Sequence, residues 1–384
     1  MTKKSDAPAI RFKGFSDAWE QRKVSDLAEK TYGGGTPTTS NEAYWNGDIP
    51  WIQSSDVADG KLLGVESRKR ITQDGLNNSS AQLIPENSIA IITRVGVGKL
   101  AFMPYSYATS QDFLSLSKLN AEPFFTVYAC YKKLQSELNA VQGTSIKGIT
   151  KDELLAKSIM VPQYAEQRQI GAFFKQLDHL ITLHQRKFEK LTNVKKSMLE
   201  KMFPQNGSSY PEIRFKGFTD PWEQRKLGEL VDVCSGRDYK HLSEGTIPVY
   251  GTGGYMLSVN DALSYDRDAI GIGRKGTIDR PYILKAPFWT VDTLFYAIPR
   301  EKADLNFAFD IFQNIDWKKK DESTGVPSLS KTAINDIDVL APKHGEQQTI
   351  GQFFAAIDHL ITLHQRELEK LQNIKKSMLE KMFV

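Results

Sequence analysis

The chain has 384 residues, of which 40% are hydrophobic and 25% are charged. A globular domain typically has ~100–200 residues, so this length predicts two or three domains, and the composition excludes a wholly disordered chain. The net charge of +4 permits nucleic-acid binding without requiring it. No apolar run approaches the ~20 residues that cross a bilayer, and no apolar segment follows the lysines near the start, so we expect neither a membrane span nor a secretory signal.

The two cysteines, Cys130 and Cys234, are too few for a disulfide framework and form no CxxC pair. A reducing, cytoplasmic environment is therefore the expected location, and a zinc site built on thiolates is not expected.

Two segments of the chain occur twice. Residues 10–27 and 213–230 agree at 13 of 18 positions, and residues 166–203 and 346–383 agree at 28 of 38. The regions between them, 31–165 and 234–345, differ in length and in sequence. This arrangement indicates a duplicated constant frame that carries two different variable regions, rather than a solenoid, whose repeats run only ~20–50 residues.

The longer repeated segment is predicted to be a helix. Its apolar residues recur at alternating steps of four and three, the coiled-coil period, apart from one gap where Lys195 takes an apolar position. No proline or glycine interrupts the segment between Gly171 and Phe203. Thirty-three helical residues rise ~50 Å. A lone amphipathic helix of this length needs a partner, and the second copy supplies one. The spacing leaves parallel and antiparallel pairing open. The residues expected at the helix-pair interface are Ile170, Phe174, Leu177, Ile181, Phe188, Leu191, Ile350, Phe354, Ile357, Ile361, Leu368 and Leu371.

Histidines also recur in the long segments, at His179 and His184 and again at His359 and His364. Their spacing of five residues does not place them on one helix face, where residues three or four apart lie. We therefore expect no metal site.

Both variable regions are predicted to mix α and β structure. In the first, residues 87–103 form a strand, a tight turn and a strand, residues 122–141 have helical spacing, and a short helix is capped near Thr150. The second region follows the same plan with other residues, and its Lys331 lies 180 positions after Lys151.

The loops of these regions hold side chains suited to nucleic acid. Arginine can bond guanine through two hydrogen bonds, glutamine can bond adenine, and serine or lysine can hold phosphates. The predicted DNA-binding residues are Gln53, Ser54, Ser55, Asp56, Arg94, Lys99, Gln111, Thr144, Ser145, Lys147 and Lys151, with Tyr250, Thr252, Tyr255, Arg274, Lys275 and Lys331 in the second region.

Motifs of the common enzyme classes are missing. The glycine-rich segments 96–100 and 273–277 fail the spacing of a phosphate-binding loop, and the chain holds no HExxH, GxSxG or zinc quartet. This favours a binding subunit without catalytic residues over an enzyme.

Together these features resemble the DNA-specificity subunits of type I restriction-modification systems. The resemblance rests on the lead-in motifs Trp19–Lys23 and Trp222–Lys226, the strand at residues 48–52, the glycine turns, Gln111 with Asp112, and the Pro-x-x-x-Glu-Gln motifs that begin at Pro162 and Pro342. With the duplicated helices it covers residues 10–384.

The resemblance implies an α+β fold. Two mixed α/β target-recognition domains are separated by two long antiparallel helices, in a pseudo-twofold internal repeat. The domains are expected at 1–165 and 205–345, and the helical spacers at 166–204 and 346–384. Each recognition domain would read one half of a bipartite, asymmetric site on double-stranded DNA.

The resemblance also implies the partners. Two modification subunits would bring S-adenosylmethionine and methylate adenine, and two restriction subunits would add translocation and cleavage driven by ATP and Mg. No cofactor is expected on this chain itself. The helix pair would act as a ruler, so deleting the heptad Leu191–Ser197 is expected to shorten or abolish the unread spacer without changing either half-site.

Three alternatives remain open from sequence. The chain could be the recognition subunit of another phage-defence methyltransferase system, or an orphan that swaps targets, and neighbouring genes would decide this. It could be a self-sufficient enzyme with a cryptic site, which would transfer methyl groups without partners. It could be a coiled-coil scaffold, which the two dissimilar variable regions disfavour.

Overall fold

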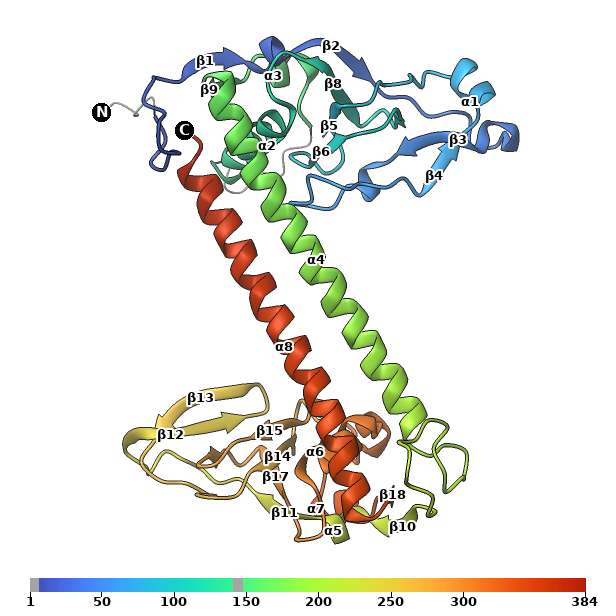
Figure 1. The fold of residues 1–384 in the computed structure, drawn as a ribbon, viewed down its shortest axis with the longest axis vertical. Coiled ribbons are helices and arrows are strands. Elements are labelled where there is room, and N and C mark those ends of the chain that lie inside the picture. The colour runs from blue at the N-terminus through green and yellow to red at the C-terminus, as the bar shows by residue number, and fades with distance from the viewer. Residues whose placement is uncertain (1–6, 141–147) are drawn as a thin grey trace. The chain divides into compact units, whose positions relative to one another are not determined.

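The computed structural model describes residues 7–140 and 148–384, which divide into two compact units (Figure 1). Unit 1 comprises residues 1–185 and 366–384, and unit 2 comprises residues 186–365. Two long helices, α4 (Tyr164–Met202) and α8 (His344–Lys381), each contribute one part to each unit. Within the described residues, no helix combines the length and the apolar character that a membrane span requires.

Unit 1 is built from two main sheets and a pair of strands. The order of the larger sheet is β2-β8-β5-β6, that of the smaller is β4-β3-β7, and β1 pairs with β9. The strands are β1 Glu20–Lys23, β2 Ala28–Gly33, β3 Trp45–Ile52, β4 Lys69–Ile71, β5 Ser88–Ile92, β6 Leu100–Met103, β7 Ala108–Thr109, β8 Phe113–Leu119 and β9 Ser158–Val161. The α-helices besides α4 and α8 are α1 Gln73–Asn77, α2 Pro123–Ala140 and α3 Lys151–Leu155, and the 3-10 helices are η1 Val24–Leu27, η2 Glu42–Tyr44 and η3 Ser54–Asp56.

Unit 2 repeats this arrangement. Its sheets have the orders β11-β17-β14-β15 and β13-β12-β16, and β10 pairs with β18. The strands are β10 Glu223–Lys226, β11 Val231–Ser235, β12 Glu244–Gly251, β13 Gly254–Val259, β14 Ala269–Gly273, β15 Tyr282–Leu284, β16 Trp289–Thr290, β17 Leu294–Pro299 and β18 Asp338–Ala341. The helices besides α4 and α8 are α5 Leu227–Leu230, α6 Leu305–Asn314, η4 Trp317–Lys320 and α7 Lys331–Asn335.

Several local predictions from sequence are confirmed. The strand–turn–strand of residues 87–103 is the antiparallel pair β5 and β6, and residues 122–141 contain α2. Thr150 caps α3, since its hydroxyl accepts a hydrogen bond from the amide of Glu153. In each unit one of the two central strands of the four-stranded sheet, β5 or β14, is buried along its whole length, as expected of a strand covered on both faces.

The two long helices run antiparallel, which settles the orientation that the spacing left open. In unit 1, Phe174 near the start of α4 packs against Phe383, just beyond the end of α8, with ring centroids 5.7 Å apart. In unit 2, Phe203, just beyond the end of α4, packs against Phe354 near the start of α8 at 6.4 Å. Each helix begins two residues after a proline, Pro162 or Pro342, and two residues before the repeated segment. There are 39 residues in α4 and 38 in α8.

The shorter repeated segment, which we call the lead-in segment, closes the end of the helix pair in each unit. It comprises residues 10–27 in unit 1 and 213–230 in unit 2. In unit 1, the amide of Ile10 donates to the carbonyl of Lys381 at the end of α8, and Arg11 forms a two-bonded ion pair with Glu166 near the start of α4 (2.7 Å for both bonds). The side chain of Glu166 is fully buried. The start of the shorter repeated segment, at Ile10 and Arg11, therefore ties the two helices together.

The same closure occurs in unit 2. The amide of Ile213 donates to the carbonyl of Lys201 at the end of α4, and Arg214 pairs with Glu346 near the start of α8 at 2.7 and 2.8 Å. This equivalence explains why residues 10–27 and 213–230 agree so closely, since each must fit the same helix ends.

The long helices pass very close to the N-termini of α2 and α6. A Cβ atom added at Gly351 would lie 2.4 Å from Oδ1 of Asp304 and 2.7 Å from the backbone nitrogen of Phe307. Gly171 is equivalent in unit 1, where the added atom would lie 2.8 Å from the nitrogen of Phe125. A side chain at either position would push the helix that it faces out of place.

We expect Gly351→Ala to lower the stability of unit 2 by about 1–3 kcal/mol, because overpacking at a backbone contact forces a shift. Gly345→Ala is the matched control in the same helix, since an added Cβ there meets no atom within 4 Å. Urea unfolding of both variants checks the prediction, and an equal effect of the two substitutions would contradict it.

Candidate nucleic-acid interface

Loops at one end of the sheets of unit 1 are held together by backbone hydrogen bonds. The amide of Ser110 donates to the carbonyl of Ile52 (3.0 Å), that of Thr93 to Asp112 (2.7 Å), and that of Ile149 to Thr93 (2.7 Å). We call these loops loop cluster 1, which comprises residues 33–36, 52–56, 93–99, 109–112 and 148–151. The bonds join segments far apart in sequence into one surface.

Unit 2 holds an equivalent set of loops with the same bonds. The amide of Val291 donates to Tyr250 (3.0 Å), that of Arg274 to Thr293 (2.8 Å), and that of Leu329 to Arg274 (2.9 Å). Loop cluster 2 comprises residues 235–238, 250–254, 274–277, 290–293 and 327–331. The two units therefore share a hydrogen-bonded frame on which different side chains are displayed.

A buried tryptophan fixes the glycine-rich loop of each cluster. The indole of Trp51, on β3, donates to the carbonyl of Gly35 at 2.9 Å, and the indole of Trp289, on β16, donates to that of Arg237 at 2.9 Å. The tryptophans come from different strands of the smaller sheet, yet they bond equivalent carbonyls. This rigid attachment keeps the polar loop in place next to β3 or β12.

The structure brings several predicted residues of unit 1 together. Gln53, Ser54 and Ser55 lie at the end of β3, and Gln111 lies across from them, where its side chain accepts a hydrogen bond from Thr36 (2.6 Å). Arg94 is exposed on the β5–β6 turn of the same cluster. Lys99 ends that turn, and Lys151 is the first residue of α3, which follows the backbone bond from Ile149 to Thr93. The predicted residues Thr144, Ser145 and Lys147 lie outside the described residues.

Asp56 does not present its side chain for base recognition. The side chain is fully buried, and Oδ2 accepts the backbone amide of Gln53 at 2.9 Å. Its carboxylate instead closes the turn that displays Gln53, Ser54 and Ser55.

The predicted residues of unit 2 form an aromatic surface. Tyr250 lies on β12. Tyr255 follows the tight turn at residues 251–254 that joins β12 to β13, and its side chain is 63% exposed. The ring of Tyr250 meets that of Tyr255 edge to face, with centroids 6.4 Å apart, and that of Tyr282 at a tilt, with centroids 6.1 Å apart. Burial raises the pKa of Tyr282, whose hydroxyl donates to the carbonyl of Gly251 at 2.6 Å. Thr252 lies in the turn itself.

Loop cluster 2 also contains basic residues. Arg274 and Lys275 are exposed in the β14–β15 loop, and the guanidinium of Arg274 lies 5.6 Å from the ring centre of Phe295. Lys331 begins α7 at the far end of the cluster and is exposed. Exposed arginine and lysine side chains suit contacts with phosphates and with base edges.

The sequence prediction missed three candidates in the loop that follows β11. Arg237, Lys240 and His241 are exposed there, and the ring of His241 lies 5.9 Å from that of Trp289. The segment aligns with the glycine-rich loop at residues 33–36, so the position of its glycine, Gly236, was the available signal.

The predicted helix-pair residues lie along the facing sides of α4 and α8. Ile170, Phe174 and Leu177 are buried in the core of unit 1 with the last turns of α8, where Leu371 packs against them. The core of unit 2 contains Ile350, Phe354 and Ile357, with Ile361 packed against it. Leu368 is buried. The other predicted residues, Ile181, Phe188 and Leu191, are half-buried.

No group of three potential metal ligands occurs among residues 7–140 and 148–384. His179 and His359 are exposed on the long helices.

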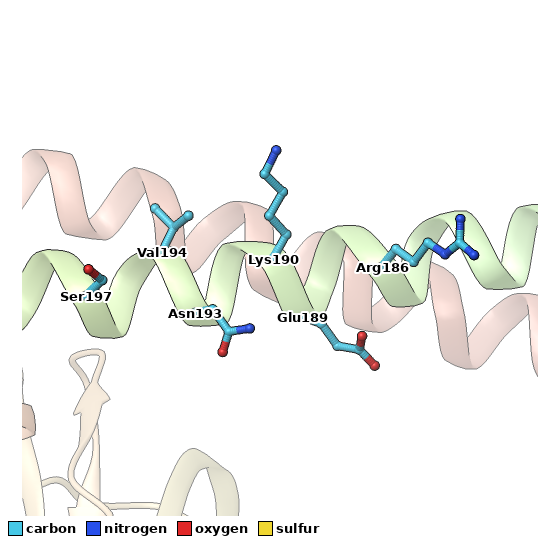
Figure 2. A pocket seen from close by; sticks show the side chains of 6 residues that line it. All are labelled: Arg186, Glu189, Lys190, Asn193, Val194 and Ser197. Atoms are coloured by element: carbon cyan, nitrogen blue, oxygen red, sulfur yellow. The ribbon is translucent and has the colours of Figure 1, made fainter. Parts of the chain in front are cut away.

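Figure 2 shows a shallow hollow on the surface of α4. It is lined by Arg186, Glu189, Lys190, Asn193, Val194 and Ser197. The equivalent stretch of α8 has the same kind of hollow, lined by Arg366, Glu369, Lys370, Asn373, Ile374, Ser377 and Met378. Five of the six residues on α4 are identical at the equivalent positions of α8, although earlier positions in the helices differ, such as Lys175 and Ala355. The two hollows thus offer nearly the same polar surface twice.

Comparison with known proteins gives a consistent picture. The family model described as "Type I restriction modification DNA specificity domain" matches residues 16–193 and 219–373. The type I restriction enzyme MjaIX specificity subunit of Methanocaldococcus jannaschii is 28% identical over 231 residues, which are 57% of this chain and 52% of that protein. In that comparison the chain spans about half the length of its relative.

Other comparisons extend over nearly the whole chain. The MjaVIII specificity subunit of the same organism is 22% identical over 94% of this chain and 91% of its own length. The crystal structure of a type I restriction-modification S subunit from M. genitalium superposes with a TM-score of 0.74 at 18% identity, covering 98% of this chain and 99% of the other. This last similarity supports the fold.

Proposed function

Because the chain belongs to the family of type I restriction-modification DNA specificity subunits, we propose that its two units each bind one half of a divided, asymmetric DNA site. It is a DNA specificity subunit, a role that carries no catalysis. We call residues 28–161 reader 1 and residues 231–341 reader 2. They lie inside the recognition domains expected at 1–165 and 205–345.

The observation that carries this proposal is the pair of loop clusters, which have one frame and different side chains. Reader 1 displays amide, hydroxyl and arginine groups at Gln53, Ser55, Gln111 and Arg94. Reader 2 displays Tyr255 and the exposed basic side chains of Arg274 and Lys275. Readers with the same backbone frame and unlike surfaces would approach DNA in the same way and recognise different base sequences.

The antiparallel helices would set the distance between the half-sites. Each of α4 and α8 is continuous, so its length can fix a number of unread base pairs. The helical spacers expected at 166–204 and 346–384 correspond to this role.

The repeated hollows on α4 and α8 would receive two modification subunits, one on each helix. Both hollows present Arg, Glu, Lys and Asn side chains, so each could bind a copy of the same partner. Those subunits would carry S-adenosylmethionine, and two restriction subunits would supply chemistry driven by ATP and Mg. A cytoplasmic site of action agrees with the two free cysteines, Cys130 and Cys234.

The test is to map methylated bases in a host that makes the modification subunit, with and without this chain. We expect a divided adenine-methylation motif that appears only when the chain is present. A motif that persists without the chain would contradict the proposal. Methyl transfer by the purified chain alone would instead identify a self-sufficient enzyme.

A further inference from the structure

Each unit contains a buried polar cluster where the helix pair meets the helix of the adjoining reader. In unit 1, Lys375 on α8 pairs with Asp178 on α4 at 2.5 Å and also donates to the carbonyl of Gly60 at 3.1 Å. The hydroxyl of Tyr128, on α2, donates to the other oxygen of Asp178 at 2.6 Å. This cluster holds one cation, one anion and one neutral phenol, so its charges balance.

The cluster of unit 2 has the same ion pair but a different third member. Lys195 on α4 contacts both carboxylate oxygens of Asp358 on α8, at 2.5 and 2.6 Å, and donates to Oε1 of Gln313 at 2.6 Å. Asp310 on α6 takes the place of Tyr128, since each lies three residues after the buried phenylalanine that packs on the helix pair. Asp310 is 1% exposed, and its Oδ2 has no hydrogen-bond partner among the residues that the structure describes.

The surroundings of Asp310 cannot neutralise a second carboxylate. The charged groups that face it are Lys195 from α4, Asp358 from α8 and Asp304 at the start of α6. The only cation among these three already binds Asp358 and Gln313. Burying an unpaired carboxylate is costly, so the site favours the neutral acid.

The titration of Asp310 follows from these contacts. Burial raises the pKa of Asp310 well above its ordinary value; the charge of Lys195 opposes this, and those of Asp358 and Asp304 add to it. In unit 1, burial moves the pKa of Tyr128 further above the ordinary value of about 10, so the phenol keeps its proton. Of the two equivalent positions, Asp310 in unit 2 is a carboxylic acid and Tyr128 in unit 1 is a phenol.

We propose that Asp310 is a proton-dependent latch, which holds α6 against α4 and α8 while it is a neutral acid and releases α6 when it ionises. Reader 2 is then attached to the helix pair in a pH-dependent way, and reader 1 is not. The latch distinguishes two units whose frames are otherwise equivalent.

The direction of the effect is fixed by proton linkage. When α6 is released and Asp310 meets water, its pKa returns to about 4, so the seated state holds a proton that the released state loses. The stabilisation is complete below about pH 4 and declines as the pH rises toward the raised pKa. Within that window the equilibrium constant for release rises about tenfold per pH unit, the slope for one proton.

Amide hydrogen exchange of the intact chain, measured from about pH 5 to about pH 9 and corrected for the chemical exchange rate, tests the latch. We expect the protection of α6 to fall by up to about tenfold per pH unit in part of this range, while that of α2 stays constant. Asp310→Asn keeps the shape and removes the titration, so it should flatten the α6 profile. Tyr128→Phe is the matched substitution in unit 1 and should leave the pH profile of α2 unchanged.

Two results would overturn the proposal. One is a wild-type chain in which α6 and α2 lose protection with the same dependence on pH, a comparison that needs no variant. The other is an Asp310→Asn chain that keeps the wild-type slope in α6.

Discussion

Replacing Arg214 by alanine should destabilise unit 2 by about 3–5 kcal/mol, because it leaves a buried carboxylate without its partner. The guanidinium of Arg214 makes two bonds to Glu346, at 2.7 and 2.8 Å, and a third to the carbonyl of Asp220 at 2.6 Å. The side chain of Glu346 is only 3% exposed. Urea unfolding of the wild-type and variant chains measures the loss.

Two further variants separate this cause from a general loss of packing. Arg214→Ala combined with Glu346→Gln removes the unpaired charge and should recover part of the stability. Lys226→Ala breaks the exposed pair with Asp338 in the same unit and should cost less than about 1 kcal/mol. If Arg214→Ala were no more damaging than Lys226→Ala, the lead-in segment would not close the helix pair as described.

A matched deletion of one heptad from both long helices should shorten the unread part of the DNA site by about three base pairs or abolish methylation. Seven helical residues span about 10 Å, and a base pair rises about 3.4 Å. The segments to remove are residues 183–189 of α4 and 363–369 of α8. Mapping of methylated bases gives the spacer, and both half-site sequences should remain unchanged.

The polar clusters decide where these deletions belong. Asp178 and Lys195 lie 17 residues apart on α4, and their partners Lys375 and Asp358 lie 17 apart on α8. Equal deletions between them keep both ion pairs in register, whereas deleting Leu191–Ser197 would remove Lys195 itself. Deletion from α4 alone is the control and should destabilise the chain. An unchanged spacer, or an altered half-site, in the matched variant would contradict the ruler.

Much of the fold could be predicted because the duplication exposes what each segment must do. Apolar residues such as Phe174 and Phe354 recur with the coiled-coil period, and both prove to lie in the cores at the helix pair. The direction of pairing was not predictable from this pattern, since the same stripe packs in either orientation. Lys195 looked like an interruption of the stripe, because its partner Asp358 is distant in sequence and on the other helix.

The candidate site was less predictable, because loop composition does not reveal where a side chain points. Gln53 and Asp56 lie in the same polar segment, yet the carboxylate of Asp56 accepts a hydrogen bond from the backbone amide of Gln53 and does not face outward. Arg237 was missed because its loop resembles its counterpart only at a glycine. Asp310 sits within an ordinary amphipathic helix, and only the three-dimensional surroundings mark it as unusual.

The most direct test of the account replaces reader 2 by a second copy of reader 1. In this chimera residues 28–161 are inserted in place of residues 231–341, between the flanking segments that the repeat has in common. Methylated bases are then mapped in a host that supplies the modification subunit. We predict a symmetric motif, in which the half-site of reader 1 occurs twice in inverted orientation because the helices run antiparallel. A motif that retained the original second half-site would show that reader 2 does not determine it.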